Sequence, residues 1–229
     1  MAEVRLSLII PTLDEADIID ETLGRLQGLR NEGAELIVAD GGSGDDTRAR
    51  AAPLASRVIQ SPPGRARQMN AGADAAQGKH LVFLHADTRL PQHADRLIEE
   101  ALSRGRCWGR FDIRLQGHHP MLPVIAFAMN RRSRLTGIAT GDHALFMTHE
   151  VFEGVGGFPD QPLMEDIEMS RRLRRLSPPV CLSKTVTSSG RRWDQAGAWP
   201  TIRLMWRLRF RYWRGDAPEA LAREYRDVR

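Results

Sequence analysis

The stretch Lys79-His80-Leu81-Val82-Phe83-Leu84-His85-Ala86-Asp87-Thr88 indicates the fold class of the chain. Its apolar centre is too short and too apolar for a surface helix, and is typical of a strand buried on both faces of a parallel sheet. Polar residues follow at the carboxyl end, where open α/β sheets bind their ligands. Asp87 is therefore placed to hold a hard cation against a phosphate, or alternatively to cap the turn before a helix expected near 93–103.

Strand and helix patterns alternate along the first half of the chain. Strands are expected over 5–10, 35–39, 57–60 and 79–87, with a helix after each of the first three. Thr12 or Asp14 would cap the first helix, and Asp45 or Asp46 would begin the second. The helix after the third strand is expected over 65–76. The second half is less regular, with strands expected over 108–115, 144–148 and 180–187, a helix over 122–135 and another that opens at 163–168. This order predicts a doubly wound, mostly parallel α/β sheet flanked by helices.

Three of the expected strands end in turns rich in carboxylate and hydroxyl groups, namely Thr12 with Glu15, Asp40, and His85 with Asp87. If the strands are parallel, these turns lie on one rim of the sheet. The carboxylates of such a rim repel a bare phosphate unless a cation, or the neutral nucleobase and ribose of a nucleotide, lies between the carboxylates and the phosphate. The pattern favours a metal–nucleotide ligand. Residues 11–15 contain no Gly-x-Gly-x-x-Gly turn, which argues against a nicotinamide cofactor.

Size and composition are those of a soluble globular protein, with 229 residues, 41% hydrophobic and 27% charged. No apolar run approaches the roughly 20 residues that span a bilayer. The first residues lack a signal-peptide pattern, and Cys107 and Cys181 have no metal or redox spacing. We therefore expect a cytoplasmic protein.

Positive charge is concentrated in residues 190–229, which hold ten arginines and five acidic residues, whereas the whole chain has a net charge of +4. This argues against a nucleic-acid-binding face spread over the chain, and no nucleic-acid partner is expected. On a helix, tryptophans spaced by seven residues form one stripe and arginines a second, made up of Trp199, Trp206 and Trp213, and of Arg203, Arg207, Arg211 and Arg214. Such a helix suits peripheral contact with an anionic membrane. The alternative is that the Trp stripe packs on the rest of the protein and the Arg stripe is solvated.

Six segments, taken together, resemble the family 2 glycosyltransferases, which have a GT-A fold. They occur in the family's order and cover about residues 5 to 176: 7–15 (SLIIPTLDE), 36–43 (LIVADGGS), 70–72 (NAG), 83–87 (FLHAD), 156–159 (GGFP) and 164–166 (MED). The sequence looks most similar to small, non-processive bacterial members. The resemblance implies a nucleotide-sugar-binding catalytic GT-A domain over 1–189. The charge and the Trp/Arg spacing described above predict a basic helical tail over 190–229.

The resemblance also implies where the donor binds. The turn after the first strand and the Asp ending the second would hold the base, and a basic residue before the Asn-x-Gly helix would contact the donor. The second Asp of the family's Asp-x-Asp motif, here Asp87, would bind Mg²⁺ or Mn²⁺ and bridge it to the diphosphate. The first Asp is replaced by His85, which can donate to a ribose hydroxyl but supplies no carboxylate. The donor-binding residues implied are Pro11, Thr12, Leu13, Glu15, Asp40, Gly42, Arg65 (rather than Arg67), Gln68, His85, Ala86 and Asp87.

The pair Glu165-Asp166 matches the family's catalytic base, with Asp166 preferred. A positioned carboxylate would take the proton of the acceptor hydroxyl, a contribution on the order of 10²–10⁴-fold, and attack opposite the leaving diphosphate would invert the anomeric carbon. The alternative is that both acids only stabilise a helix N-terminus. Asp142 would line the acceptor or metal side, or cap a turn. Arg192 and Trp193 match part of an Arg-Trp acceptor motif of processive relatives.

The hypothesis from the sequence is an inverting, metal-dependent glycosyltransferase. It would move a sugar from a nucleotide-diphosphate donor, preferably a UDP-sugar, to a lipid-linked or small hydroxyl acceptor, as a cytoplasmic protein peripheral to the inner face of the membrane. A sugar-nucleotide pyrophosphorylase is an alternative, but it needs a Gly-rich basic turn that residues 11–15 do not provide. A non-catalytic nucleotide- or membrane-binding module is another.

Overall fold

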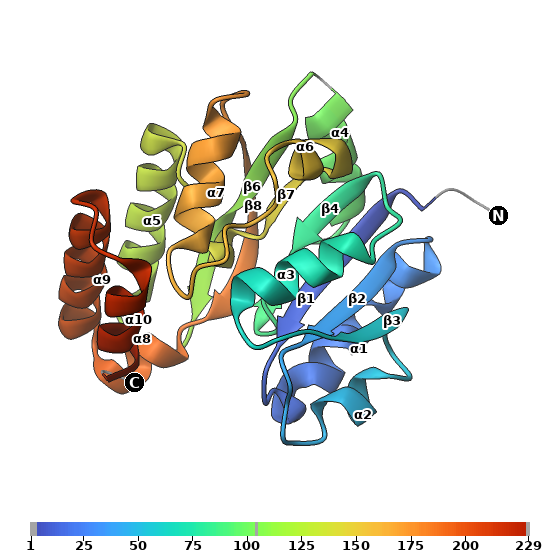
Figure 1. Cartoon of the computed structure of the whole chain (residues 1–229), viewed down its shortest axis with the longest axis horizontal. Coiled ribbons are helices and arrows are strands. Elements are labelled where there is room, and N and C mark those ends of the chain that lie inside the picture. The colour runs from blue at the N-terminus through green and yellow to red at the C-terminus, as the bar shows by residue number, and fades with distance from the viewer. Residues whose placement is uncertain (1–3, 104, 228–229) are drawn as a thin grey trace.

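The computed structural model describes residues 4–103 and 105–227 of the chain. These residues form an eight-stranded sheet with helices on both faces (Figure 1), in the strand order β3-β2-β1-β4-β7-β6-β8-β5. The first four strands are parallel: β1 (Leu6–Thr12), β2 (Glu35–Asp40), β3 (Arg57–Gln60) and β4 (His80–Phe83). The expected doubly wound α/β arrangement is confirmed.

The strand order reverses at β1, because β2 and β3 lie on one side of it and β4 on the other. In open α/β sheets, the carboxyl ends of the strands at such a reversal form the crevice in which ligands bind. The turns after β1, β2 and β4 therefore lie on the same rim, as the sequence predicts.

The other strands make the sheet mixed. They are β5 (Thr88–Arg89), β6 (Trp108–Gln116), β7 (Leu145–Thr148) and β8 (Val180–Ser189). β7 runs antiparallel to β4 and to β6, β8 is parallel to β6, and β5 pairs antiparallel with β8 at the edge. The single strand expected over 79–87 is therefore wrong in its second half, because β4 ends at Phe83. Since a four-residue loop links β4 to the far edge strand, the sheet must curl.

Ten α-helices and one short 3-10 helix lie among the described residues. They are α1 (Ala16–Asn31), α2 (Thr47–Ala51), α3 (Arg65–Asp74), α4 (Ala94–Ser103), α5 (Leu122–Thr136), η1 (Gly141–His143), α6 (His149–Gly154), α7 (Glu165–Arg174), α8 (Arg191–Ala196), α9 (Ala198–Trp213) and α10 (Pro218–Asp227). The helices expected over 65–76, 93–103 and 122–135 occur within two residues of those bounds.

Alternating side chains of the buried strands supply a core on each face of the sheet. In β1, Leu8 and Ile10 belong to the core that includes residues of α1, α2, α4 and α5. Ile9 points to the other face, where the core includes residues of α3, α6 and α7. A strand covered on both faces reads as a continuous apolar run, which is why its sequence shows no polar alternation.

The expected cap of the first helix is wrong, whereas Asp46, one of the two residues expected to begin the second helix, stands at its N-cap. Glu15 and Asp46 stand at the N-cap positions of α1 and α2, and neither side chain makes a capping hydrogen bond. Thr12, Asp14 and Asp45 instead bond within the turns after β1 and β2. Sequence spacing alone does not distinguish a helix cap from a contact between two loops.

The tail forms three helices at the end of the molecule beside α5 and α7 (Figure 1). Leu204 and Leu208 of α9 pack in one cluster with Met164 and Ile167 at the start of α7. The tryptophans lie on the outside, where Trp199, Trp206 and Trp213 are 64%, 75% and 71% exposed. The expectation that the Trp stripe could pack on the rest of the protein is therefore wrong, because leucines fill that face of the helix. None of the described helices has the length and apolar content that crossing a bilayer requires.

Candidate functional site

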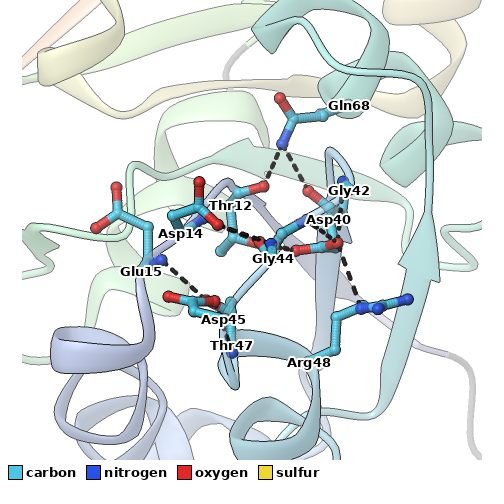
Figure 2. Close-up of polar contacts among 12 residues, drawn as sticks. Thr12, Asp14, Glu15, Asp40, Gly42, Gly44, Asp45, Thr47, Arg48 and Gln68 are labelled. Carbon is cyan, nitrogen blue, oxygen red and sulfur yellow. Dashed lines mark hydrogen bonds and ion pairs between the residues drawn. The ribbon is translucent and has the colours of Figure 1, made fainter.

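The turns after β1 and β2 are organised around the carboxylate of Asp40 (Figure 2). This fully buried carboxylate accepts hydrogen bonds from the backbone amides of Gly42 and Ser43, both at 3.0 Å. It also accepts from the Ser43 hydroxyl and, at 3.4 Å, from the Thr12 hydroxyl. Gly42 has φ +95°, a conformation that glycine adopts without steric cost. Asp40 therefore shapes the turn, and its buried charge is stabilised by these donors.

A second set of contacts joins the same two loops. Asp14 Oδ1 accepts a hydrogen bond from the amide of Gly44 at 2.8 Å, and the amide of Glu15 donates to Thr47 Oγ1 at 2.8 Å. Asp45 accepts from both the hydroxyl and the amide of Thr47, and these bonds, the hydroxyl first, lower the pKa of Asp45. The two loops thus form one continuous surface before any ligand binds.

Gln68 on α3 contacts the ends of β1 and β2 from the other side of the two loops (Figure 2). Its Nε2 donates to the carbonyl oxygens of Thr12, at 2.6 Å, and Ala39, at 3.0 Å. The side chain is buried, so in this conformation Gln68 positions the ends of β1 and β2. Its expected direct contact with a donor stays a prediction.

A small, partly open cavity with a volume of about 10 Å³ lies at the carboxyl end of β4. Residues from α3, the loop after β4, η1 and the start of α7 line it, among others: Arg65, Met69, Phe83, His85, Gly141, Leu145, Phe158, Glu165 and Asp166. Met164, immediately before α7, has φ +66°, which is uncommon for a residue other than glycine. Such backbone strain is typical of functional sites.

The two acids at the start of α7 have different surroundings. Glu165 is almost fully buried; burial first, and then the charge of Asp166, raises the pKa of Glu165. Arg65 Nη1 lies 3.9 Å from Glu165 Oε1 and opposes that shift. Asp166 is half-buried, and its Oδ2 accepts a hydrogen bond from the amide of Gly141 at 2.9 Å. The geometry therefore leaves Asp166 the more accessible and the better oriented carboxylate.

His85, which replaces a carboxylate in the metal-binding pattern, is paired with another acid. Its Nδ1 lies 3.3 Å from Asp142 Oδ1. Burial would raise the pKa of Asp142, but the His85 hydrogen bond and charge and the nearby Arg65 outweigh it and lower that pKa to about 2. On its other side, the ring of His85 lies against Gly141, where an added Cβ would overlap with it. Asp142 thus supplies a carboxylate beside the position where the sequence lacks one.

Asp87 lies in a larger groove on the other side of the loop after β4. The groove has a volume of about 540 Å³ and is lined mainly by polar side chains, including Glu21, Arg25, Asp87, Arg89, Gln116, His118, Ser188, Arg191 and Asp194. The Asp87 side chain is exposed, and its Oδ1 lies 3.4 Å from the hydroxyl of Thr88, which bonds in turn to Ser188 at 3.2 Å. Asp87 therefore stands directly before β5, which pairs with β8, and its side chain is only weakly held.

The structure brings some of the predicted site residues together and separates others. Arg65, His85, Glu165 and Asp166 line one cavity, with Asp142 bonded to His85. Ala86 and Asp87 line the larger groove, and Asp40 is enclosed in its turn. Pro11 lies within β1, and Leu13 is 47% exposed at the rim. The three acids Asp40, Asp87 and Asp166 therefore do not line one common cavity in this conformation.

The predicted acceptor residues of the tail do not line the groove, although their neighbours do. The guanidinium of Arg192 stacks over the ring of Tyr225 at 4.0 Å, and Trp193 packs against the main core. The groove is lined instead by Arg191 and Asp194, one residue before and after this pair. Asp194 accepts hydrogen bonds from the amides of His118 and His119, a contact that nothing in the sequence indicates.

The acidic side chains of the site suit a divalent cation that is bound mainly by oxygen atoms of the nucleotide substrate. In the part of the chain that the structure describes, no three His, Cys, Asp or Glu side chains are grouped as metal ligands. Mg²⁺ and similar hard cations bind nucleotide substrates through one or two carboxylates, phosphate oxygens and water. Asp87, exposed and only weakly engaged by Thr88, fits that mode.

Comparison with known proteins identifies the chain's relatives. The family model described as Glycosyl transferase family 2 matches residues 7–153. Succinoglycan biosynthesis protein ExoA of Rhizobium meliloti (strain 1021) is 30% identical over 72% of this chain and 57% of its own length. The chain thus spans little more than half of that relative.

Two solved structures show the same fold at lower identity. Mannosyltransferase PcManGT from Pyrobaculum calidifontis, in complex with GDP-Man and Mn²⁺, has a TM-score of 0.69 at 19% identity, covering 100% of this chain and 70% of that one. Glucosyl-3-phosphoglycerate synthase from Mycobacterium tuberculosis, in complex with Mn²⁺, UDP and glucosyl-3-phosphoglycerate, has a TM-score of 0.63 at 20% identity, covering 85% and 75%. These similarities confirm the GT-A fold.

Proposed function

Because the chain belongs to glycosyl transferase family 2, we propose that it transfers a sugar from a nucleotide-diphosphate donor to an acceptor hydroxyl. The observation that carries this proposal is the cavity in which Glu165 and Asp166 meet Arg65 and His85, residues from distant parts of the sequence. A carboxylate at this place, beside a rim built for a ligand, provides the base that attack by a hydroxyl requires.

The donor nucleotide would lie on the joined loops after β1 and β2. Their backbone is held by Asp40, Asp14 and Gln68, so a planar base would meet a surface that needs little reorganisation. We propose a UDP-sugar as the donor, since uridine diphosphate is what one structural neighbour contains, whereas another contains GDP-Man. Arg65, half-exposed at the start of α3, would contact the donor phosphates or sugar.

We assign the general base to Asp166. Its hydrogen bond from the Gly141 amide orients the carboxylate, whereas burial favours the neutral form of Glu165. Proton removal by Asp166 from the acceptor hydroxyl, with attack opposite the departing diphosphate, would invert the configuration of the transferred sugar.

Asp87 would hold Mg²⁺ or Mn²⁺ against the donor diphosphate. A bound cation would stabilise the negative charge that develops on the leaving group. The loop after β4 carries both His85, which lines the small cavity, and Asp87, which lines the larger groove.

We also propose a lipid-linked acceptor, reached at an anionic membrane surface. The exposed aromatic face of α9 supports this, because Trp and Phe side chains rimmed by arginine suit the boundary between headgroups and acyl chains. Two of the arginines are tied to α10, since Arg207 pairs with Glu224, and Arg211 with both Asp216 and Glu224. Contact with the membrane would therefore depend mainly on the aromatic residues.

The direct test of the proposed chemistry is Asp166→Asn. Loss of the base should lower the rate of nucleoside-diphosphate release, from a panel of nucleotide sugars with Mn²⁺, by on the order of 10²-fold or more. The donor dissociation constant, measured by calorimetry, should change by no more than about twofold. Asp166 would act on the acceptor hydroxyl in the transition state, so its loss should not affect binding of the donor.

Glu168→Gln is the matched control, since it also removes an acid from the first turn of α7, where Glu168 pairs with Arg171 and Arg172. If the Asp166 and Glu168 variants lose activity equally, the acids act only on the helix N-terminus and the assignment is wrong.

The test of the proposed metal ligand is Asp87→Ala, which should abolish the Mn²⁺-dependent part of donor binding. Metal-dependent binding that survives this change would contradict the assignment to Asp87.

A further inference from the structure

One ring nitrogen of His85 is buried and has no hydrogen-bond partner among the described residues. This atom, Nε2, belongs to a side chain that lines the small cavity at the carboxyl end of β4. His143 also has a buried Nε2 without such a partner, but its side chain lines neither this cavity nor the larger groove. Because buried polar atoms are almost always paired, an unpaired nitrogen beside a cavity indicates a place for a group of a ligand.

The contact between His85 and Asp142 determines which hydrogen bond Nε2 can make. Nδ1 of His85 lies 3.3 Å from Oδ1 of Asp142. Burial would raise the pKa of Asp142, but His85 and Arg65 lower it to about 2, so this carboxylate is ionised at neutral pH and only accepts hydrogen bonds. The hydrogen of the contact therefore lies on Nδ1. In a neutral imidazole ring, Nε2 is then left as a hydrogen-bond acceptor.

The cavity beside His85 has room for one hydroxyl group but not for a sugar ring. Its volume of about 10 Å³ is close to that of a single water-sized sphere. Its polar lining comes from Arg65, His85, Glu165 and Asp166. A hydroxyl oxygen placed there can accept a hydrogen bond from the Arg65 guanidinium and donate one to Nε2 of His85.

The position of the cavity indicates which substrate supplies this hydroxyl. A Cβ added to Gly141 would overlap with His85 Nε2, and the amide nitrogen of Gly141 lies 2.9 Å from Asp166 Oδ2, so the two side-chain atoms are at most about 8 Å apart. None of the described residues in the loops after β1 and β2, where the nucleotide would lie, lines the cavity. A ribose hydroxyl therefore does not fit, whereas the proposed function places the transferred sugar beside the base.

We propose that Asp142 orients His85 so that Nε2 accepts a hydrogen bond from one hydroxyl group of the transferred sugar. His85 then helps to determine which nucleotide sugar is used, and Asp142 is a positioning residue. The inference rests on the proposed function, because it needs a donor sugar beside Asp166. It replaces the expectation from the sequence that His85 donates to a ribose hydroxyl.

The test compares nucleotide sugars with their nucleoside diphosphates by calorimetry, with Mn²⁺ and at about pH 8, where an ordinary imidazole is neutral. The probes are UDP-glucose, UDP-galactose and GDP-mannose, each relative to UDP or GDP, and then the monodeoxy analogues of the sugar that gains most. In the unaltered chain, loss of one particular hydroxyl should weaken binding by about tenfold or more, and loss of the others by much less. The ratio to the nucleoside diphosphate removes any effect on the metal or the nucleotide.

His85→Asn is the decisive variant, since its amide can keep the contact with Asp142 but has no atom at the place of Nε2. This variant should bind the parent sugar and the critical deoxy analogue equally. Asp142→Asn should show the same loss, because its amide can donate to Nδ1 and so turn Nε2 into a donor. His149→Asn is the matched control and should keep the full preference, because His149 also lies near an acid, with Nε2 3.8 Å from Glu153 Oε1 on α6.

Three results would overturn the proposal. The first is a panel in which no nucleotide sugar binds more tightly than its nucleoside diphosphate. The second is equal binding of all monodeoxy analogues to the unaltered chain, or an unchanged preference in His85→Asn. The third is a loss of UDP affinity in His85→Asn and Asp142→Asn as large as the loss of nucleotide-sugar affinity, which would make the pair structural. Because binding is measured without an acceptor or turnover, any of these results leaves the Asp166→Asn test of the proposed function intact.

Discussion

Glu165 shows how burial changes a single carboxyl group. Burial, and then repulsion from Asp166, raises its pKa above the ordinary value of 4.5. A carboxyl with a raised pKa in the folded state stabilises the fold below its unfolded pKa, and this contribution is lost as the pH rises through the folded pKa. Ionisation of the buried Glu165 therefore costs stability as the pH rises, beside the proposed base.

We predict that Glu165→Gln raises the melting temperature at neutral pH. Glutamine has a similar shape and cannot ionise, so the difference from the unaltered chain should be small near pH 4.5 and grow as the pH rises from there. Thermal unfolding followed by circular dichroism between about pH 4.5 and pH 8 measures this difference. A difference that does not depend on pH would show that Glu165 is not held in its neutral form by burial.

The packing of helix α3 on strand β1 depends on one residue without a side chain. A Cβ at Gly72 would overlap with Cγ2 of Ile9, so the helix can approach the sheet this closely only with glycine at that position. The approach matters for the site, because α3 also carries Arg65 and Gln68. Close packing of the helix thus sets where these two side chains meet the rim.

We predict opposite effects for two glycine-to-alanine changes in helices. Gly72→Ala should lower the free energy of unfolding by about 1–3 kcal/mol, because α3 must shift away from Ile9. Gly24→Ala in α1, where the added Cβ meets nothing within 4 Å, should raise it by about 0.5–1 kcal/mol through helix propensity. Urea unfolding of both variants gives the two values. If both changes stabilise the chain, α3 is not confined by the strand.

At the scale of the whole molecule, the tail covers the end of the sheet and presents its aromatic residues to solvent. Leu204 and Leu208 face α7, and Trp206 and Trp213 face outward next to Phe210. Large apolar side chains gathered on one exposed face indicate a contact surface. The same helix therefore connects the proposed membrane contact to the start of α7, where Asp166 lies.

We predict that Trp206→Ala combined with Trp213→Ala lowers binding to vesicles containing anionic lipid by about tenfold or more, since each buried aromatic side chain contributes about 1.5–3 kcal/mol. Because both side chains are more than two-thirds exposed, the melting temperature should not change. Leu176→Ala, at an exposed apolar residue just after α7, is the control and should bind vesicles normally. Equal binding of all three proteins in vesicle sedimentation would rule out α9 as the membrane contact.

The sequence by itself determined the first half of the fold and the identity of the family. Apolar runs such as 81–84 and the polar turns after them are local patterns, and parallel strands necessarily bring their carboxyl ends to one edge. The sequence alone therefore predicts the residues at the rim, among them Thr12, Asp40 and Asp87.

Only the tertiary structure decided how these residues are used. It enclosed Asp40 in its own turn, paired His85 with Asp142, and placed Asp87 and Asp166 in separate cavities. It also buried Leu208 of the tail against Met164 and Ile167, which flank Glu165 and Asp166. The physical reason is that hydrogen bonds, burial and charge act between atoms that are close in space, whereas periodicity reports only on neighbours along the chain.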